Sequence, residues 1–271
     1  MITIDIGKNG RLGNQMFQYA SLMGIASKQN LKYGIDYSLD DGISWKNFSD
    51  DEKKNQTTLV LPKAFNNLSA ENHSPLPKTI SEPHYHFDPK LFNIGDNVNL
   101  HGYFQSEKYF KHIEDKIRHE FTFRDDIVSY ASSYLENKRQ YETVSIHVRR
   151  GDYVNLPHHG LCDVKYYIDA IQKFSDRSFN FIVVTDDIPW AKSTFVGSDN
   201  FFISDTRNQF TDLCIMSLCD HNIIANSSFS WWGSWLNKNP DKIVIAPSVW
   251  FRDKLSSHDT KDLYISTWQI L

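Results

Sequence analysis

Residues 143–152 read TVSIHVRRGD, an alternating strand that ends in two arginines, a glycine and an aspartate. Side chains of a strand point to its two faces in turn, so Ile146 and Val148 share one face while His147 and Arg149 share the other. A strand normally hides its charges. This charged end therefore has three interpretations: a solvated strand end, a cell-adhesion Arg-Gly-Asp tripeptide, or an anion site where the strand meets a loop.

The chain after this stretch repeats one pattern, a short apolar strand followed by a helical segment. Such interleaving predicts a parallel sheet covered by helices on both faces. The expected strands are 179–185, 200–204, 221–226 and 241–247, and the expected helices are 164–174, 189–195, 209–219 and 228–238.

The first half of the chain predicts a second α/β unit. Its expected elements are a strand at 1–6, a glycine-rich turn at 7–15, a helix at 15–30, a strand at 98–102 and helices at about 107–121 and 125–140. The segment from 38 to about 95 is rich in Asp, Asn, Ser and Pro and is expected to be an irregular insertion. We therefore predict an α/β protein of two Rossmann-like lobes, 1–140 and 141–271, with parallel sheets and a cleft between them.

Composition limits the kinds of partner and the location that we expect for the protein. The 271 residues carry a formal net charge of -4, which argues against a nucleic-acid partner because such proteins present a broadly basic surface. The amino terminus has no secretion signal, and no run approaches the roughly 18 apolar residues of a membrane helix. The three cysteines show no metal-ligand spacing and are expected to be reduced thiols. We expect a cytoplasmic protein without a transmembrane segment, which leaves peripheral membrane association open.

A glycine-rich turn, GRLGNQ (10–15), opens the first helix. Glycines at that place let the backbone approach a ligand and present helix amides to an anion, whereas the alternative is an ordinary tight turn. Arg11 and Asn14 would project from this turn towards a ligand.

Ligands of open parallel sheets lie at the carboxyl ends of the strands, which places Arg149 where a phosphate would bind. The planar guanidinium is well suited to phosphate oxygens. Asp152 lies just beyond the strand end, where it would orient an arginine or contact an acceptor.

Acidic residues and serines follow two further strands. Asp186 and Asp187 come directly after strand 179–185, and adjacent carboxylates on an extended chain diverge too much to share a metal ion. One of them would bind a ribose or base edge, or would instead cap the next helix. Ser227 and Ser228 start a helix, where free amides and the macrodipole favour an anion and where serine is also a common cap.

Four motifs together resemble the α-1,2-fucosyltransferases of glycosyltransferase family 11: GRLGNQMFQYA, GYFQSEKYF, HVRRGDYV and NSSFSWWGSWL. The resemblance spans Gly10 to about Pro247 and is weakest over 38–95. It implies a GT-B fold, GDP-L-fucose as the donor, no cofactor or metal, and inversion at the fucose anomeric carbon. The implied acceptor is the 2-hydroxyl of a terminal β-galactose on an oligosaccharide or surface polysaccharide, bound on the side of the first lobe.

The resemblance also assigns residues. It implies that the second lobe binds GDP-fucose. For this chemistry we expect Arg149 to stabilise the departing β-phosphate, and Asp152 is a candidate general base because of its proximity. The full set of expected donor-binding residues is Arg11, Asn14, Gln15, His147, Arg149, Arg150, Asp186, Asp187, Asn226, Ser227, Ser228 and Phe229. Trp232 and Trp235 are expected to pack in the core.

Other functions remain as alternatives. A non-catalytic GDP-sugar-binding protein would bind GDP without transfer, and a fucosyltransferase could use another acceptor or linkage. An adhesin using Arg150, Gly151 and Asp152 would need the missing secretion signal. A protein O-fucosyltransferase would usually carry disulfides, which three cysteines fit poorly.

Overall fold

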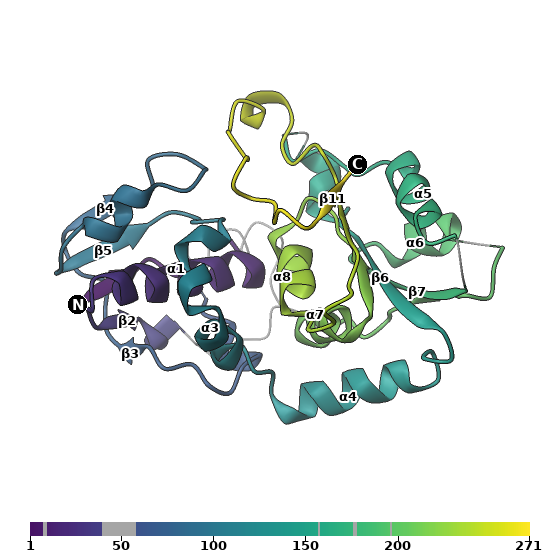
Figure 1. Cartoon of the computed structure of the whole chain (residues 1–271), viewed down its shortest axis with the longest axis horizontal. Coiled ribbons are helices and arrows are strands. Elements are labelled where there is room, and N and C mark those ends of the chain that lie inside the picture. Colours follow the sequence, from purple (N-terminus) through teal and green to yellow (C-terminus); the bar gives the residue numbers. More distant parts are fainter. Residues whose placement is uncertain (8–9, 40–57, 157, 176–177, 196) are drawn as a thin grey trace. The chain divides into compact units, whose positions relative to one another are not determined.

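The computed structural model describes residues 1–7, 10–39, 58–156, 158–175, 178–195 and 197–271 (Figure 1). These residues form two compact units. The first unit is Met1–Arg124 with Asp259–Leu263, and the second unit is Asp125–His258 with Tyr264–Leu271. The sequence placed the division near residue 140, whereas the structure places it before helix α4 (Asp125–Glu136). This helix belongs to the second unit because it packs against α7 (Gln209–Leu218).

The first unit is built on a five-stranded parallel sheet in the order β3-β2-β1-β5-β4. Its strands are β1 (Ile2–Ile4), β2 (Tyr33–Ile35), β3 (Glu71–Asn72), β4 (Thr79–Ser81) and β5 (Val98–His101), and its helices are α1 (Leu12–Lys28) and α3 (Glu114–Glu120). Helix α1 begins within the motif expected to be a turn. Asn14 and Gln15 therefore lie in the first turns of the helix, while Gly10 keeps the positive φ of a turn at +99°.

Part of the expected insertion belongs to this sheet. Residues 71–72 and 79–81 supply both edge strands, although 40–57 lie outside the described residues. Both residues of β3 are exposed, as are Thr79 and Ser81 of β4. Strands this short and this exposed lack the alternation of apolar residues by which a strand is recognised in a sequence.

The helix expected at 107–121 is instead two 3₁₀ turns, at Glu107–Tyr109 and Lys111–Ile113, followed by α3. The backbone of this segment crosses α1 very closely. A Cβ atom at Gly24 of α1 would lie 2.0 Å from the carbonyl oxygen of Tyr109. Because Tyr109 and Phe110 are fully buried at this crossing, the chain bends there rather than continuing as one helix.

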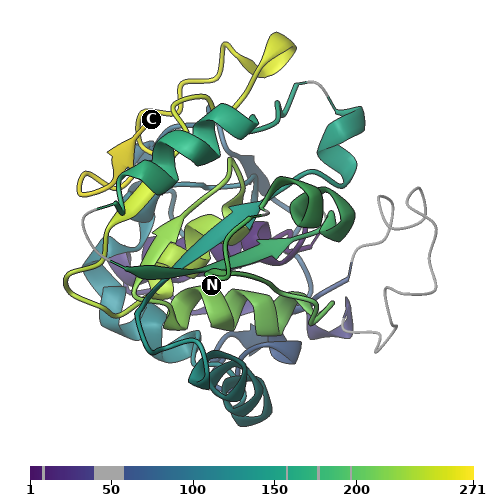
Figure 2. The ribbon, with the colours of Figure 1, turned by 90° about the vertical axis from the view of Figure 1, so that its right-hand side faces the viewer.

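The second unit has a six-stranded parallel sheet in the order β11-β10-β9-β6-β7-β8. Its strands are β6 (Glu142–Val148), β7 (Phe179–Thr185), β8 (Phe201–Ile203), β9 (His221–Ile223), β10 (Val244–Ala246) and β11 (Gln269–Ile270). Its helices, besides α4 and α7, are α5 (Val164–Gln172), α6 (Ile188–Thr194) and α8 (Ser228–Leu236). Helices lie on both faces of this sheet (Figure 2), as the sequence predicted.

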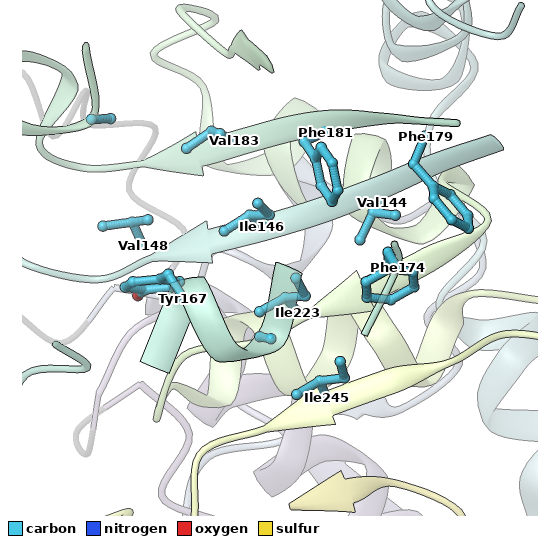
Figure 3. Close-up of a cluster of buried hydrophobic side chains, with 12 residues drawn as sticks. Val144, Ile146, Val148, Tyr167, Phe174, Phe179, Phe181, Val183, Ile223 and Ile245 are labelled. Carbon is cyan, nitrogen blue, oxygen red and sulfur yellow. The ribbon is translucent and has the colours of Figure 1, made fainter. Parts of the chain in front are cut away.

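The two faces of β6 have different partners. Val144, Ile146 and Val148 are fully buried and pack with apolar residues of β7, β9, β10 and α5 (Figure 3). On the opposite face, the Asn222 amide donates to Ser145 Oγ at 2.7 Å and to the Met216 carbonyl of α7 at 2.8 Å. His147 lies on this second face of β6, together with Ser145.

Cys162, Cys214 and Cys219 are free thiols. Within the ranges given above, no helix combines the length and apolarity required to cross a membrane.

Candidate functional site

Arg149 is held by groups from two neighbouring strand ends. Its Nη1 donates to Asp186 Oδ2, just after β7, at 2.6 Å, and its Nη2 donates to Asp152. The guanidinium carbon lies 5.1 Å from the centre of the Tyr153 ring. A guanidinium has five N–H groups, and three of those of Arg149 make no hydrogen bond to the described residues. The side chain is thus fixed in direction and still has donors for an anion.

Arg150 pairs with the second of the two adjacent carboxylates. Its Nε donates to Asp187 Oδ2 at 3.1 Å, and its guanidinium lies 4.5 Å from the Trp190 ring centre. Asp187 also caps α6 by accepting the Trp190 amide at 3.1 Å, which was one of its two expected roles. Asp186 and Asp187 therefore diverge, as expected for neighbours on an extended chain, and each engages one arginine.

The turn after β6 is wrapped around Asp186. Asp186 Oδ1 accepts the backbone amides of Arg150 at 2.8 Å and Gly151 at 3.1 Å. A Cβ atom at Gly151 would lie only 2.6 Å from Asp186 Oδ2. The Arg-Gly-Asp segment is thus folded against the end of β7, with both of its charged side chains in ion pairs. This geometry disfavours the adhesion hypothesis.

His147 is a buried neutral imidazole beside this cluster. Burial lowers its pKa to about 3, and the nearby Arg149 adds to the effect while Asp186 opposes it. The ring is 5.4 Å from the ring of Phe229, at the start of α8. Its Nδ1 has no hydrogen-bond partner in the part of the chain that the structure describes. Because buried polar atoms are normally paired, this nitrogen indicates a place for a polar ligand group.

The amino terminus of α8 approaches the same strand end. Ser227 is the cap residue, and its Oγ accepts the Phe229 amide at 3.4 Å. Phe229, one of the expected donor-binding residues, is half-buried, and its ring lies beside that of His147. Trp231, Trp232 and Trp235 fill the core, as expected for the last two.

Asn226 ties the loops of the site together. Its amide donates to the carbonyls of His159, Gly160 at 3.3 Å and Trp250 at 3.0 Å, and its Oδ1 accepts from the Cys162 thiol at 3.6 Å. Asn226 was expected to bind the donor, whereas these contacts give its side chain a structural role. Its backbone carbonyl accepts the Tyr153 hydroxyl at 3.4 Å, which links the HVRRGDY and NSSF motifs directly.

The charges of the cluster decide what it can bind. Two guanidiniums face three carboxylates, so the group does not carry a surplus of positive charge. Anion binding would instead depend on directed donors, namely the remaining N–H groups of Arg149 and the positive end of the α8 dipole. A site of this kind favours an anion of defined geometry over any diffuse negative charge.

The expected residues of the first unit have their own contacts. The Gln15 amide is buried, donates to the Thr58 carbonyl at 2.8 Å and accepts the Val60 amide at 2.9 Å, so it holds a neighbouring segment. Asn14 accepts the Gln105 amide at 2.8 Å. Arg11 is exposed at the start of α1, and its side chain does not cap that helix. Donor binding by these three residues remains a prediction.

Two contributors were missed from the sequence. Tyr153 supports Arg149 and reaches the backbone of Asn226, and Trp190 supports Arg150. Tyr153 belongs to the quoted HVRRGDY motif, so its place beside the arginines was a usable signal. Nothing in the local pattern pointed to Trp190. No group of three or more metal-ligating side chains occurs among the described residues, and metal independence stays a prediction.

Solved structures share the fold. The crystal structure of NodZ α-1,6-fucosyltransferase soaked with GDP-fucose superposes with a TM-score of 0.55 at 13% identity, covering 87% of this chain and 92% of that one. The chain therefore has the GT-B fold, with two parallel-sheet α/β units.

Sequence comparison gives the family. Glycosyl transferase family 11 matches residues 1–271, and the chain belongs to this family. It is 35% identical to an Escherichia coli alpha-1,2-colitosyltransferase, covering 92% of this chain and 93% of the relative. The O-antigen biosynthesis glycosyltransferase WbnK of Escherichia coli is 29% identical, with 95% and 98% covered. The galactoside alpha-(1,2)-fucosyltransferase 1 of Gorilla gorilla gorilla is 27% identical, with 86% and 65% covered.

Proposed function

We propose that this glycosyltransferase moves L-fucose from GDP-β-L-fucose to the 2-hydroxyl of a terminal β-galactose, with inversion and without a metal ion. The observation that carries the proposal is Arg149, fixed between Asp152 and Asp186 with N–H groups left for an anion. Family membership and the α-1,2 linkage in the names of two relatives support it.

The proposed chemistry needs stabilisation of a leaving group. As the bond from fucose C1 to the phosphate oxygen breaks, the sugar becomes oxocarbenium-like and negative charge grows on the β-phosphate of GDP. Donors fixed in advance towards that charge lower the barrier more than they stabilise the bound donor. Arg149 and the amides at the start of α8 would supply them. Asp152 and Asp186 would hold the arginine in place.

His147 would contact the nucleotide. Because its Nδ1 is buried and lacks a partner among the described residues, a polar group of the guanosine part would satisfy it. Its low pKa keeps the ring neutral, so one ring nitrogen accepts and the other donates. Ser227, Ser228 and the Phe229 amide would face the phosphates.

A second donor is suggested by the colitosyltransferase relative. Colitose lacks the 3-hydroxyl of fucose, so the two GDP-sugars differ at one position. A site that hydrogen-bonds a hydroxyl discriminates strongly against a sugar lacking it, whereas an apolar pocket does not. Comparing kcat/KM for the two GDP-sugars would decide the donor, and a preference for GDP-colitose would replace fucose in the proposal.

The names of the relatives also support the proposed acceptor. WbnK is named for O-antigen biosynthesis, which supports a surface polysaccharide or its oligosaccharide unit as acceptor. The proposal places the enzyme in the cytoplasm. A fucosyltransferase of another linkage would give a product resistant to α-1,2-fucosidase. A non-catalytic GDP-sugar-binding protein would bind GDP and release none.

The test is GDP release from GDP-L-fucose in the presence of EDTA, with and without lactose. Release that rises with lactose, and a product cleaved by α-1,2-fucosidase, are the expected results. GDP binding without turnover on any β-galactoside would overturn the proposed activity. Turnover that EDTA abolishes would overturn metal independence alone.

A further inference from the structure

A histidine of the loop before α5 lies against the aromatic partner of Arg149. The rings of His159 and Tyr153 are stacked, with their centres 4.5 Å apart and an angle of 11° between their planes. The centre of the Tyr153 ring lies in turn 5.1 Å from the guanidinium carbon of Arg149. The imidazole, the phenol and the guanidinium therefore form a continuous series of contacts within the second unit.

Both aromatic members of this series are tied to Asn226, between β9 and α8. The Tyr153 hydroxyl donates to the Asn226 backbone carbonyl at 3.4 Å, and the Asn226 side-chain amide donates to the His159 carbonyl. The His159 amide also donates to the Leu156 carbonyl at 3.0 Å. The stacked pair is thus anchored to the backbone at two neighbouring strand ends.

The loop around His159 leaves its ring little room to move away. The next residue, Gly160, has a φ of +67°, and a Cβ atom there would lie 2.8 Å from Arg252 Cδ. The Phe251 ring centre lies 6.1 Å from the His159 ring centre. The nitrogens of the His159 ring make no hydrogen bond to the residues that the structure describes, so the ring contributes its flat face.

The His159 ring is uncharged at neutral pH. Burial and the neighbouring His158 lower the pKa of His159, Asp152 opposes this, and Arg149 adds to it. The pKa therefore stays below the value of about 6.5 that is usual for histidine. A neutral ring can stack on Tyr153 without placing a second positive charge beside Arg149.

We propose that His159 is a positioning residue for the transfer, acting on Arg149 through the ring of Tyr153. The inference rests on the proposed function, in which Arg149 stabilises the departing phosphate. The hydrogen bond of the Tyr153 hydroxyl fixes the tip of that side chain, and the stacked His159 ring fixes its plane. Donors to a developing charge act best when they are held in place before the reaction, and a misplacement of about 1 Å can cost about 10²-fold in rate.

The experiment measures kcat and KM for fucosyl transfer to lactose, and GDP affinity by calorimetry, for variants of His159. His159→Ala and His159→Gln remove the flat ring. Because the two ion pairs of Arg149 remain, we expect kcat to fall about 10-fold, while KM and GDP affinity stay within about threefold. His159→Phe keeps a flat ring and is expected to restore kcat to within about threefold of the unaltered protein. His158→Ala, which removes an imidazole from the same loop, is the matched control.

A double variant tests whether the effect passes through Tyr153. Tyr153→Leu removes the ring between the histidine and the arginine, so adding His159→Ala to it is expected to cause no further loss of kcat. Losses that multiply in the double variant would show that His159 acts by another route, and would overturn the inference.

The single variants separate this inference from the proposed function. Turnover by His159→Phe as slow as that of His159→Ala would show that a ring nitrogen acts rather than the stacked face, which overturns the inference. Full activity of the variants without a ring would overturn it as well, and would leave the proposed function intact. No transfer to any β-galactoside by the unaltered protein would overturn the proposed function, and this inference with it.

Discussion

Replacing Arg149 by lysine keeps one positive charge and removes the planar fork. In the structure this fork reaches two carboxylates at once, Asp186 at 2.6 Å and Asp152, beside the Tyr153 ring. A lysine ammonium is a point charge on a flexible chain, so it can pair with only one of these two carboxylates in the geometry that the arginine has. The variant therefore separates the effect of charge from the effect of geometry.

The expected loss follows from the donors removed. Losing one fixed donor to a developing oxyanion costs about 3 kcal/mol, or roughly 10²-fold in kcat. We expect this loss for Arg149→Lys. Arg149→Ala also removes the cation that faces two carboxylates where the phosphate would bind, and unit charges 4 Å apart interact by about 4 kcal/mol near a protein surface. We therefore expect Arg149→Ala to lose 10³-fold or more and to bind GDP weakly.

The assay is GDP release from GDP-L-fucose with lactose, together with GDP affinity and thermal unfolding of each variant. Arg118→Lys is the matched control, because Arg118 is also ion-paired, through Nε at 3.0 Å and Nη2 at 2.9 Å, but to Glu114 of α3. That variant is expected to retain activity. Turnover by Arg149→Lys within about threefold of the unaltered protein would show that charge alone suffices and would refute the argument from geometry.

Three further predictions concern the same strand ends. Gly151→Ala places a Cβ 2.6 Å from Asp186 Oδ2, so the carboxylate must shift. A displacement of this kind is expected to lower kcat/KM about 10²-fold. Unchanged kinetics would show that the turn adapts. Asn226→Ala leaves buried carbonyls unpaired and is expected to lower the free energy of unfolding by about 1–3 kcal/mol in urea titrations, whereas an unchanged midpoint would argue against the loop-tying role. The pKa of His147 is about 3 in the folded protein and about 6.5 in the unfolded chain. Between these values the unfolded state binds more protons. The free energy of unfolding therefore falls as the pH drops through this window, by up to about 1.4 kcal/mol per pH unit. His147→Gln should flatten the change of melting temperature between pH 4 and 6.5, and an equally steep profile would contradict the buried neutral ring.

The strands of the second unit were predicted well because they are long and apolar enough to be recognised in the sequence. Alternation around Ile146 and Val148, and apolar runs such as 179–185, mark strands that are buried on one or both faces. Strand ends then follow from the order of elements, and so does the expectation that residues just beyond them lie together. The structure confirms this expectation for Arg149 and Asp186.

Partners across the site could not be predicted in the same way. Local pattern indicates that two adjacent carboxylates diverge, but not that Asp186 engages Arg149 while Asp187 engages Arg150. That choice depends on the register of β6 with β7 and on the cap of α6. Asn226 shows the same limit, because its three carbonyl partners come from loops distant in the sequence.

The first unit was less predictable for a physical reason. Its edge strands are two or three residues long and mostly exposed, so they leave no periodic pattern. The bend at Tyr109 and Phe110 depends on a glycine of α1 that is far away in sequence. The 3.0 Å contact between His101 Nδ1 and Asp5 Oδ2 likewise depends on the pairing of β5 (Val98–His101) with β1 (Ile2–Ile4), which are far apart in sequence.

The most direct test of the account is the structure of the product made from GDP-β-L-fucose and lactose, determined by nuclear magnetic resonance. The account predicts a single fucose in α configuration on the 2-oxygen of galactose. A β-linked fucose would contradict inversion. Attachment at another hydroxyl, or no fucosylated product, would contradict the proposed α-1,2 transfer itself.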